Sequence, residues 1–121
     1  MSWTFDFCDP VTNEVLKTDE KHNMFGGTVC VGGTNAMTLD VTYNYGVIIN
    51  TVIDGHGDTY AKFFNEKTGA EIIPILKEAI SKLGDDVDED YWTVTEGNAK
   101  RALCQLLALA QIRPDAVIHV Y

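Results

Sequence analysis

The chain has few of the residues on which several common kinds of site depend. It has 3 cysteines among 121 residues. Cys8, Cys30 and Cys104 are far apart and form no C-x-x-C pair, which argues against a disulfide framework and a structural zinc site. No apolar run approaches the roughly 18 residues of a membrane span, and the N-terminus lacks the basic and apolar parts of a signal peptide. We therefore expect reduced thiols, a cytoplasmic location and no contact with a membrane.

Positive charge is also scarce. Lys and Arg number 9 against 18 Asp and Glu, so the formal net charge is -9. Direct binding of nucleic acid is not expected, because contacts to phosphates need Lys and Arg. An acidic surface is compatible with a basic protein partner, and equally with solubility alone.

Signatures of catalysis are absent. There is no H-E-x-x-H, G-x-S-x-G or paired-carboxylate pattern. His56 and Asp58 are close enough in sequence to share a metal or a proton, but loop residues beside glycines more often form turns. We expect a protein that is not an enzyme and that uses no cofactor.

Two patterns imitate ligand-binding loops. The glycine pairs at 26–27 and 32–33 lack the spacing of a phosphate-binding loop and are better explained as tight turns or bulges. Asp86, Asp88 and Asp90 have the spacing of the first three ligands of a calcium-binding loop. The Gly and Glu that such a loop needs at its later positions are missing. A solvated acidic loop is the default interpretation.

The first half of the chain has the period-two patterns of β-strands. Residues 3–8 alternate aromatic with small or polar side chains, and 15–18 could return as a partner strand. Residues 19–23 are polar and are expected to form a loop. Further strands are predicted at 29–31, 37–45, 47–53 and 60–64. Since the links between them are short, an antiparallel meander is expected.

The second half has the pattern of two helices. Thr68 and Glu71 have capping-box spacing at the start of the first, although Pro74 conflicts with a regular helix that begins at Thr68. Either the first turn is irregular or the helix begins later. The second helix is predicted to begin at Thr95 or Gly97 and to end near Arg113, because Pro114 disfavours helix in the residue before it. The expected fold is one α+β domain over 1–121, an N-terminal antiparallel meander with two C-terminal helices packed on it.

The last helix is apolar on most sides. One face suits its own core, and a second stripe of smaller side chains consists of Cys104, Ala108 and Ile112. Residues of this size at i and i+4 let another helix come close, so a homodimer or higher oligomer is one hypothesis. Burial of the whole helix within its own domain is the other.

A binding site is easier to derive from the sequence than a reaction. Flat side chains on which a nucleotide base could stack are available, and the only two arginines fall in the last helix. Arginine suits phosphate or carboxylate, but salt bridges from these two to the acidic loop are the favoured interpretation. The candidate ligand-binding residues are Tyr43, Tyr45, Tyr91, Trp92, Asn98, Arg101 and Arg113.

Several segments together form a familiar pattern: a Gly-Gly-Thr triplet, the stretches 39–45, 67–77 and 90–92, and 96–99 through 109–115. These segments resemble a family of small, largely uncharacterised proteins from phages and prophages of Gram-positive bacteria. The resemblance spans most of the chain. Compared with the family pattern, the loop at 54–58 is short and residues 116–121 form an added last strand.

The resemblance implies a role in the host cytoplasm, and three hypotheses follow from it. An oligomer could sequester a small nucleotide immune signal, as phage sponge proteins do. The acidic surface could instead inhibit a host nuclease or another protein that handles nucleic acid, as many anti-CRISPR proteins do. The third hypothesis is a virion accessory or structural protein.

Overall fold

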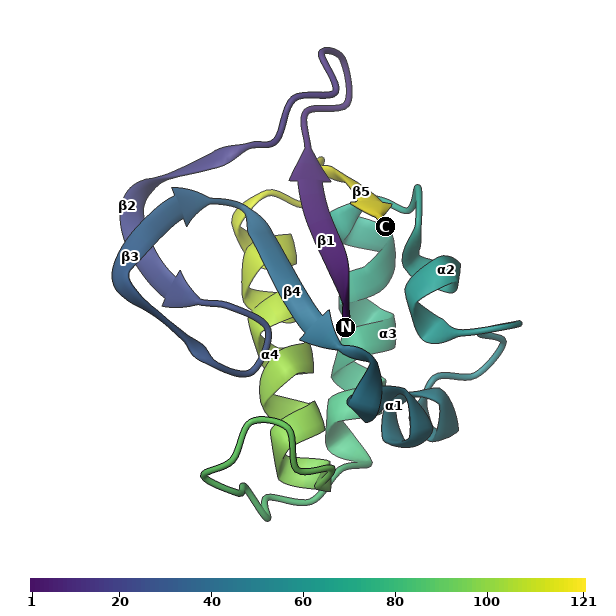
Figure 1. Ribbon diagram of the computed structural model, residues 1–121. Helices are drawn as coiled ribbons and strands as arrows, with labels where there is room; N and C mark the ends of the chain where they lie inside the picture. The colour runs from purple at the N-terminus through teal and green to yellow at the C-terminus, as the bar shows by residue number, and fades with distance from the viewer.

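A three-stranded antiparallel sheet and two long helices form the centre of the protein (Figure 1). The computed structural model describes all residues from 1 to 121. In the sheet, β1 (Ser2–Cys8) lies between β4 (Thr38–Thr42) and β5 (Val117–Val120). Behind the sheet, α3 (Gly69–Ser81) and α4 (Glu96–Ile112) lie side by side. The predicted α+β class is confirmed, as is the last short strand.

The alternation of residues 3–8 does place one face of β1 in the core. Phe5 and Phe7 are fully buried, and Phe5 pairs with the buried Leu39 of β4. Because side chains alternate along a strand, Thr4 lies on the opposite face, directly across from Asp40. The sheet therefore has an apolar inner face toward the helices and a polar outer face.

The strands do not form the predicted meander. β2 (Lys17–Met24) and β3 (Val29–Ala36) pair with each other in a separate two-stranded sheet, the ribbon at the left of Figure 1. The prediction of a loop at 19–23 is wrong, because those residues belong to β2. Much of β2 is exposed, so it has no apolar face and no alternation that a sequence pattern could detect.

The predicted strand at 47–53 is also wrong. A 3-10 turn, η1 (Tyr43–Tyr45), leads into the helix α1 (Gly46–Val52). The buried residues of this stretch are Tyr45, Ile49 and Ile53, four positions apart, which is the spacing of a helix face. In this stretch apolar side chains occupy both the odd and the even positions, so alternation cannot distinguish a strand from a helix. The β-branched residues favour a strand, and this propensity led to the wrong prediction.

The residues predicted as a strand at 60–64 instead form the short helix α2 (Tyr60–Phe64). Tyr60, Ala61 and Phe64 are all buried. A strand would send Ala61 to the face opposite its neighbours, whereas a helix keeps all three toward the core. An ion pair between Asp58 and Lys62, 2.7 Å long and four residues apart, spans the start of this helix.

The capping box of α3 is confirmed. The Thr68 hydroxyl accepts from the Glu71 amide at 3.2 Å, and the Glu71 carboxylate accepts from the Thr68 amide at 3.0 Å. Pro74 lies inside the helix, which starts at Gly69 and not later. Both Pro74 and Ala70 are exposed, so water can bond the carbonyl that the missing proline N–H leaves free.

Helix α4 agrees with the prediction at both ends. Thr95 caps it by accepting from the Asn98 amide, and it ends before Arg113. Its inner face is part of a cluster of 23 buried residues that also includes residues of β1, β4, α1, α2, α3 and β5. Helix α4 therefore has its N-terminal end beside the loop at 82–95 and its C-terminal end beside β5.

Candidate functional site

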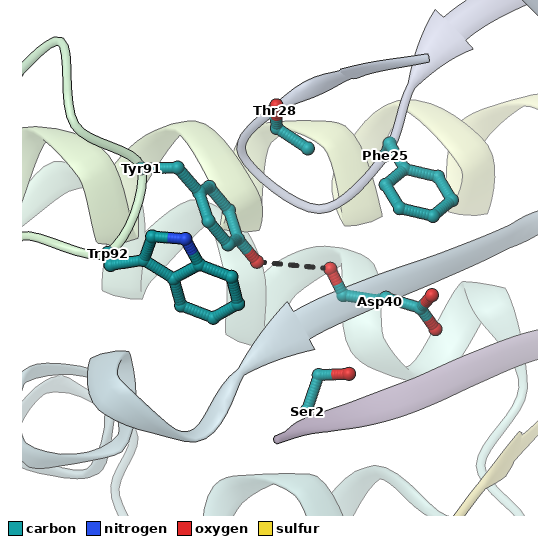
Figure 2. A pocket seen from close by; sticks show the side chains of 6 residues that line it. All are labelled: Ser2, Phe25, Thr28, Asp40, Tyr91 and Trp92. Carbon is teal, nitrogen blue, oxygen red and sulfur yellow. Dashed lines mark hydrogen bonds between the residues drawn. The ribbon is translucent and has the colours of Figure 1, made fainter.

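A pocket of about 400 Å³ lies at the outer edge of β4 (Figure 2). Its size falls in the range of small-molecule sites. Three parts of the chain line it: the start of the sheet, the loop between β2 and β3, and the loop before α4. The lining residues are Ser2, Phe25, Thr28, Asp40, Tyr91 and Trp92.

Aromatic side chains face one another across this pocket. Figure 2 shows Tyr91 and Trp92 on one side and Phe25 on the other. The rings of Tyr91 and Trp92 meet edge to face, with centroids 4.9 Å apart. Trp92 is 54% exposed, so much of its ring remains accessible. The pocket thus has flat apolar walls of the kind on which a planar ring can stack.

The Tyr91 hydroxyl bonds to the free edge of β4. It accepts from the Thr42 amide at 3.0 Å and donates to the Asp40 carbonyl at 3.4 Å, the bond drawn in Figure 2. β4 is an edge strand, whose unpaired backbone groups would otherwise be open to another chain. Tyr91 is therefore held in place by the sheet itself.

Four of the predicted ligand-binding residues come together at this corner. The Tyr45 hydroxyl donates to the Tyr91 carbonyl, and the Asn44 amide donates to the Trp92 carbonyl at 3.2 Å. These bonds join η1 to the loop before α4. Tyr45 is fully buried behind the pocket. Tyr43 is half-exposed, packs against the ring of Trp3 and lies outside the pocket lining. Only Tyr91 and Trp92 line the pocket.

The structure gives Asn98 a structural position. It is buried, and its amide donates to the carbonyls of Asp90 and Thr93 at 3.1 and 2.9 Å. Its side-chain oxygen accepts from the Asp88 amide at 3.0 Å. Asn98 therefore holds the loop that carries Tyr91 and Trp92, and it lies outside the pocket lining.

The glycine pair at 26–27 allows a close approach of three chain segments. Both residues have positive φ, +80° and +109°. A Cβ on Gly26 would lie 1.8 Å from the Asp40 carbonyl oxygen, and one on Gly27 would lie 3.2 Å from the Tyr91 ring. A tight turn is thus confirmed for this pair, and only glycine lets the loop pass between β4 and Tyr91.

Arg101 and Gln105, one turn apart on α4, bond to the same loop. The Arg101 guanidinium donates to the Gly27 carbonyl at 3.1 Å, and the Gln105 amide donates to the Thr28 carbonyl at 3.4 Å. The Gln105 oxygen accepts from the Gly27 amide. Arg101 thus lies one residue from the pocket wall at Thr28, and it does not pair with the acidic loop.

Asp40 is the only residue of the pocket lining with a charged side chain. The Thr4 hydroxyl donates to its Oδ1 at 2.7 Å, and Asp40 takes part in none of the chain's ion pairs. The lining contains no Lys or Arg. The interior of the pocket therefore accepts hydrogen bonds and disfavours negative charge.

The phenols of this corner remain protonated at neutral pH. Burial raises the pKa of Tyr45 and of Tyr91 above the usual value for tyrosine, and it does the same for Tyr60 in the core. Protonated phenols can donate hydrogen bonds, as Tyr91 does to Asp40.

Arg113 lies away from this pocket. Its guanidinium donates twice to the Asp115 carboxylate, both bonds 2.9 Å long. Twelve residues at about 1.5 Å each separate it from Arg101, roughly 18 Å along the helix. The two arginines do not converge on one ligand, and Arg113 pairs with its own neighbour and not with the acidic loop.

The predicted oligomer stripe lies on the surface of the chain. Cys104 is exposed, Ala108 is half-buried and Ile112 is 50% exposed. Burial of the whole helix in its own domain, the alternative, is wrong for this stripe. The rest of α4 is buried on the opposite side, so the stripe is accessible to a second chain.

The carboxylates of the acidic loop accept hydrogen bonds from backbone amides. Asp86 accepts from the Gly97 amide at 3.1 Å, Asp88 from the Asp90 amide at 2.8 Å, and Asp90 from the Trp92 amide at 3.0 Å. These bonds give the loop a defined path to Trp92. The structure contains no group of three or more His, Cys, Asp or Glu side chains that could hold a metal ion.

Four lining residues were not among the sequence candidates: Ser2, Phe25, Thr28 and Asp40. Phe25 directly precedes the glycine pair at 26–27, and an aromatic residue in a glycine-rich loop was the available signal. Asp40 falls on the polar face of its predicted strand, and Ser2 falls just before the first predicted strand. Nothing local distinguishes them, because the pocket exists only where three segments meet.

Comparisons with protein-family models, with curated proteins and with solved structures found no match. None of the helices is long and apolar enough to span a membrane. The fold and the pocket therefore define the protein only as a small α+β protein with an aromatic ligand-sized pocket.

Proposed function

We propose that this protein is a non-enzymatic binder of a small nucleotide, and that it sequesters such a molecule as an immune signal of a bacterial host. The observation that carries the proposal is the pocket of about 400 Å³ between Phe25, Tyr91 and Trp92. In this proposal the base enters between the aromatic walls. Stacking on an aromatic side chain contributes about 1–3 kcal/mol per base.

The sugar and phosphate would point out of the pocket. The carboxylate of Asp40 would repel a phosphate held inside it. Arg101 uses one guanidinium nitrogen for the carbonyl of Gly27, which is next in sequence to the lining residue Thr28. Its remaining N–H groups can donate to a phosphate at the rim, since a guanidinium has five.

The setting in host defence rests on the resemblance to small phage and prophage proteins. A phage protein of this kind acts in the host cytoplasm and needs only to bind its target, because removal of a signal by tight binding is enough. The site supports this role through binding groups held by backbone hydrogen bonds, which reduce the entropy lost on binding.

Tryptophan fluorescence tests the proposal directly. The chain has 2 tryptophans, so a Trp3→Phe background leaves Trp92 as the single reporter. Titration with the four ribonucleoside monophosphates, cyclic nucleotides and ADP-ribose should quench it, and calorimetry should give a matching affinity. If no compound of this panel produces heat or quenching, nucleotide binding is refuted.

Two variants separate stacking from general effects. Trp92→Ala should weaken binding by about 5- to 150-fold, the equivalent of one stacked base. Tyr43→Ala is the matched control, because Tyr43 is an exposed aromatic of the same corner that lies outside the pocket lining. Equal loss in both variants would contradict a base seated on Trp92.

A second function is supported by a different surface. Every residue from 84 to 90 is exposed, and five of these seven are acidic. Such a surface attracts basic protein partners. We therefore keep, as the alternative proposal, inhibition of a host nuclease or another nucleic-acid-handling protein. Absence of heat with all nucleotides, together with co-purification of a Cas nuclease that a Glu89→Lys variant loses, would favour it.

Self-association is the third element of the proposal. The exposed stripe Cys104–Ala108–Ile112 could pair with the same stripe of a second copy about a twofold axis. Equilibrium sedimentation should show a dimer at micromolar concentration, and Ala108→Glu should dissociate it. A monomer of the unaltered protein at that concentration would refute the dimer without affecting the pocket.

A further inference from the structure

We propose that the pocket selects guanine among the bases, through the carboxylate of Asp40. This inference rests on the nucleotide-binding function proposed above and names the class of ligand that the same site takes. It is argued from the hydrogen-bonding groups that the pocket presents between its aromatic walls.

Asp40 is an acceptor without a cationic partner. It extends from the polar outer face of β4 beside the pocket, and its own carbonyl is bonded to Tyr91 (Figure 2). The Thr4 hydroxyl holds Oδ1 at 2.7 Å, which fixes the carboxylate and leaves Oδ2 and the second lone pair of Oδ1 for a ligand. An ionised carboxylate has about four lone-pair sites, so both oxygens can accept from one ligand at once.

The bases differ in what they offer to a carboxylate. Guanine has two adjacent donors on its Watson–Crick edge, the N1–H and the 2-amino group, which match two carboxylate oxygens. Adenine and cytosine place one amino group beside a ring nitrogen that is an acceptor, and uracil places one N–H between two carbonyl oxygens. Against a carboxylate each of these acceptors is repelled. Guanine is the one base with two adjacent donors, and its O6 acceptor lies on the far side of N1–H from the 2-amino group.

The walls are consistent with this orientation. Trp92 and Phe25 supply apolar surface for either face of a purine, and they distinguish poorly between bases because every base has a π-face. The hydroxyls of Ser2 and Thr28 can each donate or accept. Selectivity is therefore left to Asp40, the only charged side chain of the lining.

The experiment compares four nucleotides that differ only in the base edge. Affinities of GMP, IMP, XMP and AMP are measured by calorimetry. GMP should bind most tightly. IMP, which lacks the 2-amino group, should bind about 10-fold more weakly, as expected for one hydrogen bond to a charged group. XMP, whose carbonyl oxygen would face the carboxylate, and AMP should bind more weakly still.

An Asp40→Asn variant reverses one of these preferences. Its amide offers one donor and one acceptor, which match the carbonyl and N1–H of xanthine. The variant should lose GMP affinity and gain XMP affinity. The matched control is Asp6→Asn, because Asp6 also accepts from a threonine hydroxyl, Thr38 at 2.6 Å, but lies outside the pocket lining. It should leave the order of affinities unchanged.

The possible outcomes separate the two proposals. Tight binding of several bases with equal affinity, or an Asp40→Asn variant that keeps the GMP preference, would refute guanine selection and leave nucleotide binding intact. No binding of any of the four compounds or of the wider nucleotide panel would refute both. Thermal unfolding of each variant checks that the fold is retained.

Discussion

The chain's two arginines lie toward opposite ends of α4, Arg101 in its first half and Arg113 directly after its last residue, and their surroundings differ. At the N-terminal end, Arg101 bonds to a backbone carbonyl of the glycine loop, beside a pocket with aromatic walls. At the C-terminal end, Arg113 is paired twice with Asp115, two residues along the chain. One arginine retains donors for a ligand, whereas the other has a carboxylate partner from its own segment.

This difference shows that a site depends on segments distant in sequence. The pocket end is assembled by hydrogen bonds across separations of 46 to 78 residues, from Tyr45 to Tyr91 and from Gly27 to Gln105. The other end satisfies its charge locally. Perturbing the two ends separately tests whether the pocket end is the functional one, and the expected effects are described from the largest to the smallest.

Gly26→Ala should have the largest effect. Its Cβ would lie 1.8 Å from the Asp40 carbonyl oxygen at a φ of +80°. We expect a loss of about 4 kcal/mol in the free energy of unfolding, from overpacking and a left-handed residue together. The control is Gly32→Ala, with a φ of +83° and nothing within 4 Å, which should lose only about 1 kcal/mol. Urea unfolding measures both, and equal losses would disprove the close approach.

Asn98→Ala should come next. It removes three buried hydrogen bonds that hold the loop of Tyr91 and Trp92. The expected loss is about 2–3 kcal/mol, with a red shift of Trp92 emission as the loop loosens. Asn44→Ala, which removes one exposed bond to the Trp92 carbonyl, should lose about 0.5–1 kcal/mol. A small loss in Asn98→Ala without a spectral change would mean that the loop is held in another way.

Alkaline pH should destabilise the pocket end. Burial raises the pKa of Tyr45 and Tyr91 above the value of about 10 in an unfolded chain. A raised pKa in the folded state stabilises the protonated form. This contribution is therefore complete below about pH 10 and is lost as the pH rises beyond it. Urea unfolding from pH 8 to 11 should show the decline, and Tyr45→Phe should reduce it; an unchanged slope in that variant would assign the decline to other groups.

Arg113→Ala should have the smallest effect. Its ion pair is exposed and screened by water, so the unfolding midpoint should move little. Nucleotide affinity should stay as in the unaltered protein, because the Arg113 guanidinium is paired with Asp115 and has no contact with the glycine loop beside the pocket. Arg101→Ala should in contrast weaken nucleotide binding. The reverse result, loss of nucleotide binding in Arg113→Ala alone, would place the ligand at the C-terminal end of α4 and contradict the proposed pocket.

Much of the fold was predictable where local signals agree. The alternation at 3–8, the capping box at Thr68 and Glu71 and the proline after Arg113 each specify an element by short-range chemistry. The predictions failed where no local signal existed or where it was ambiguous. Polar β2 has no buried face, and the stretch 47–53 has apolar residues in both phases.

The candidate site was predictable in part. Tyr91 and Trp92 were recognised as flat side chains on which a base could stack, and both line the pocket. Asp40, Phe25, Thr28 and Ser2 were not, because each has an ordinary pattern in its own segment. Asn98 and Tyr45 were taken for ligand contacts, but the structure buries both and uses their polar groups to hold the loop.

The sequence by itself determined the elements whose signals lie within a few residues: the first strand, the two long helices with their caps, the acidic loop and the net charge. Only the tertiary structure decided which side chains share a pocket, which arginine keeps free donors and which glycines must remain glycine. The physical reason is the sequence range over which each kind of interaction acts. Capping and periodicity act over three or four residues, whereas the pocket depends on contacts between segments dozens of residues apart.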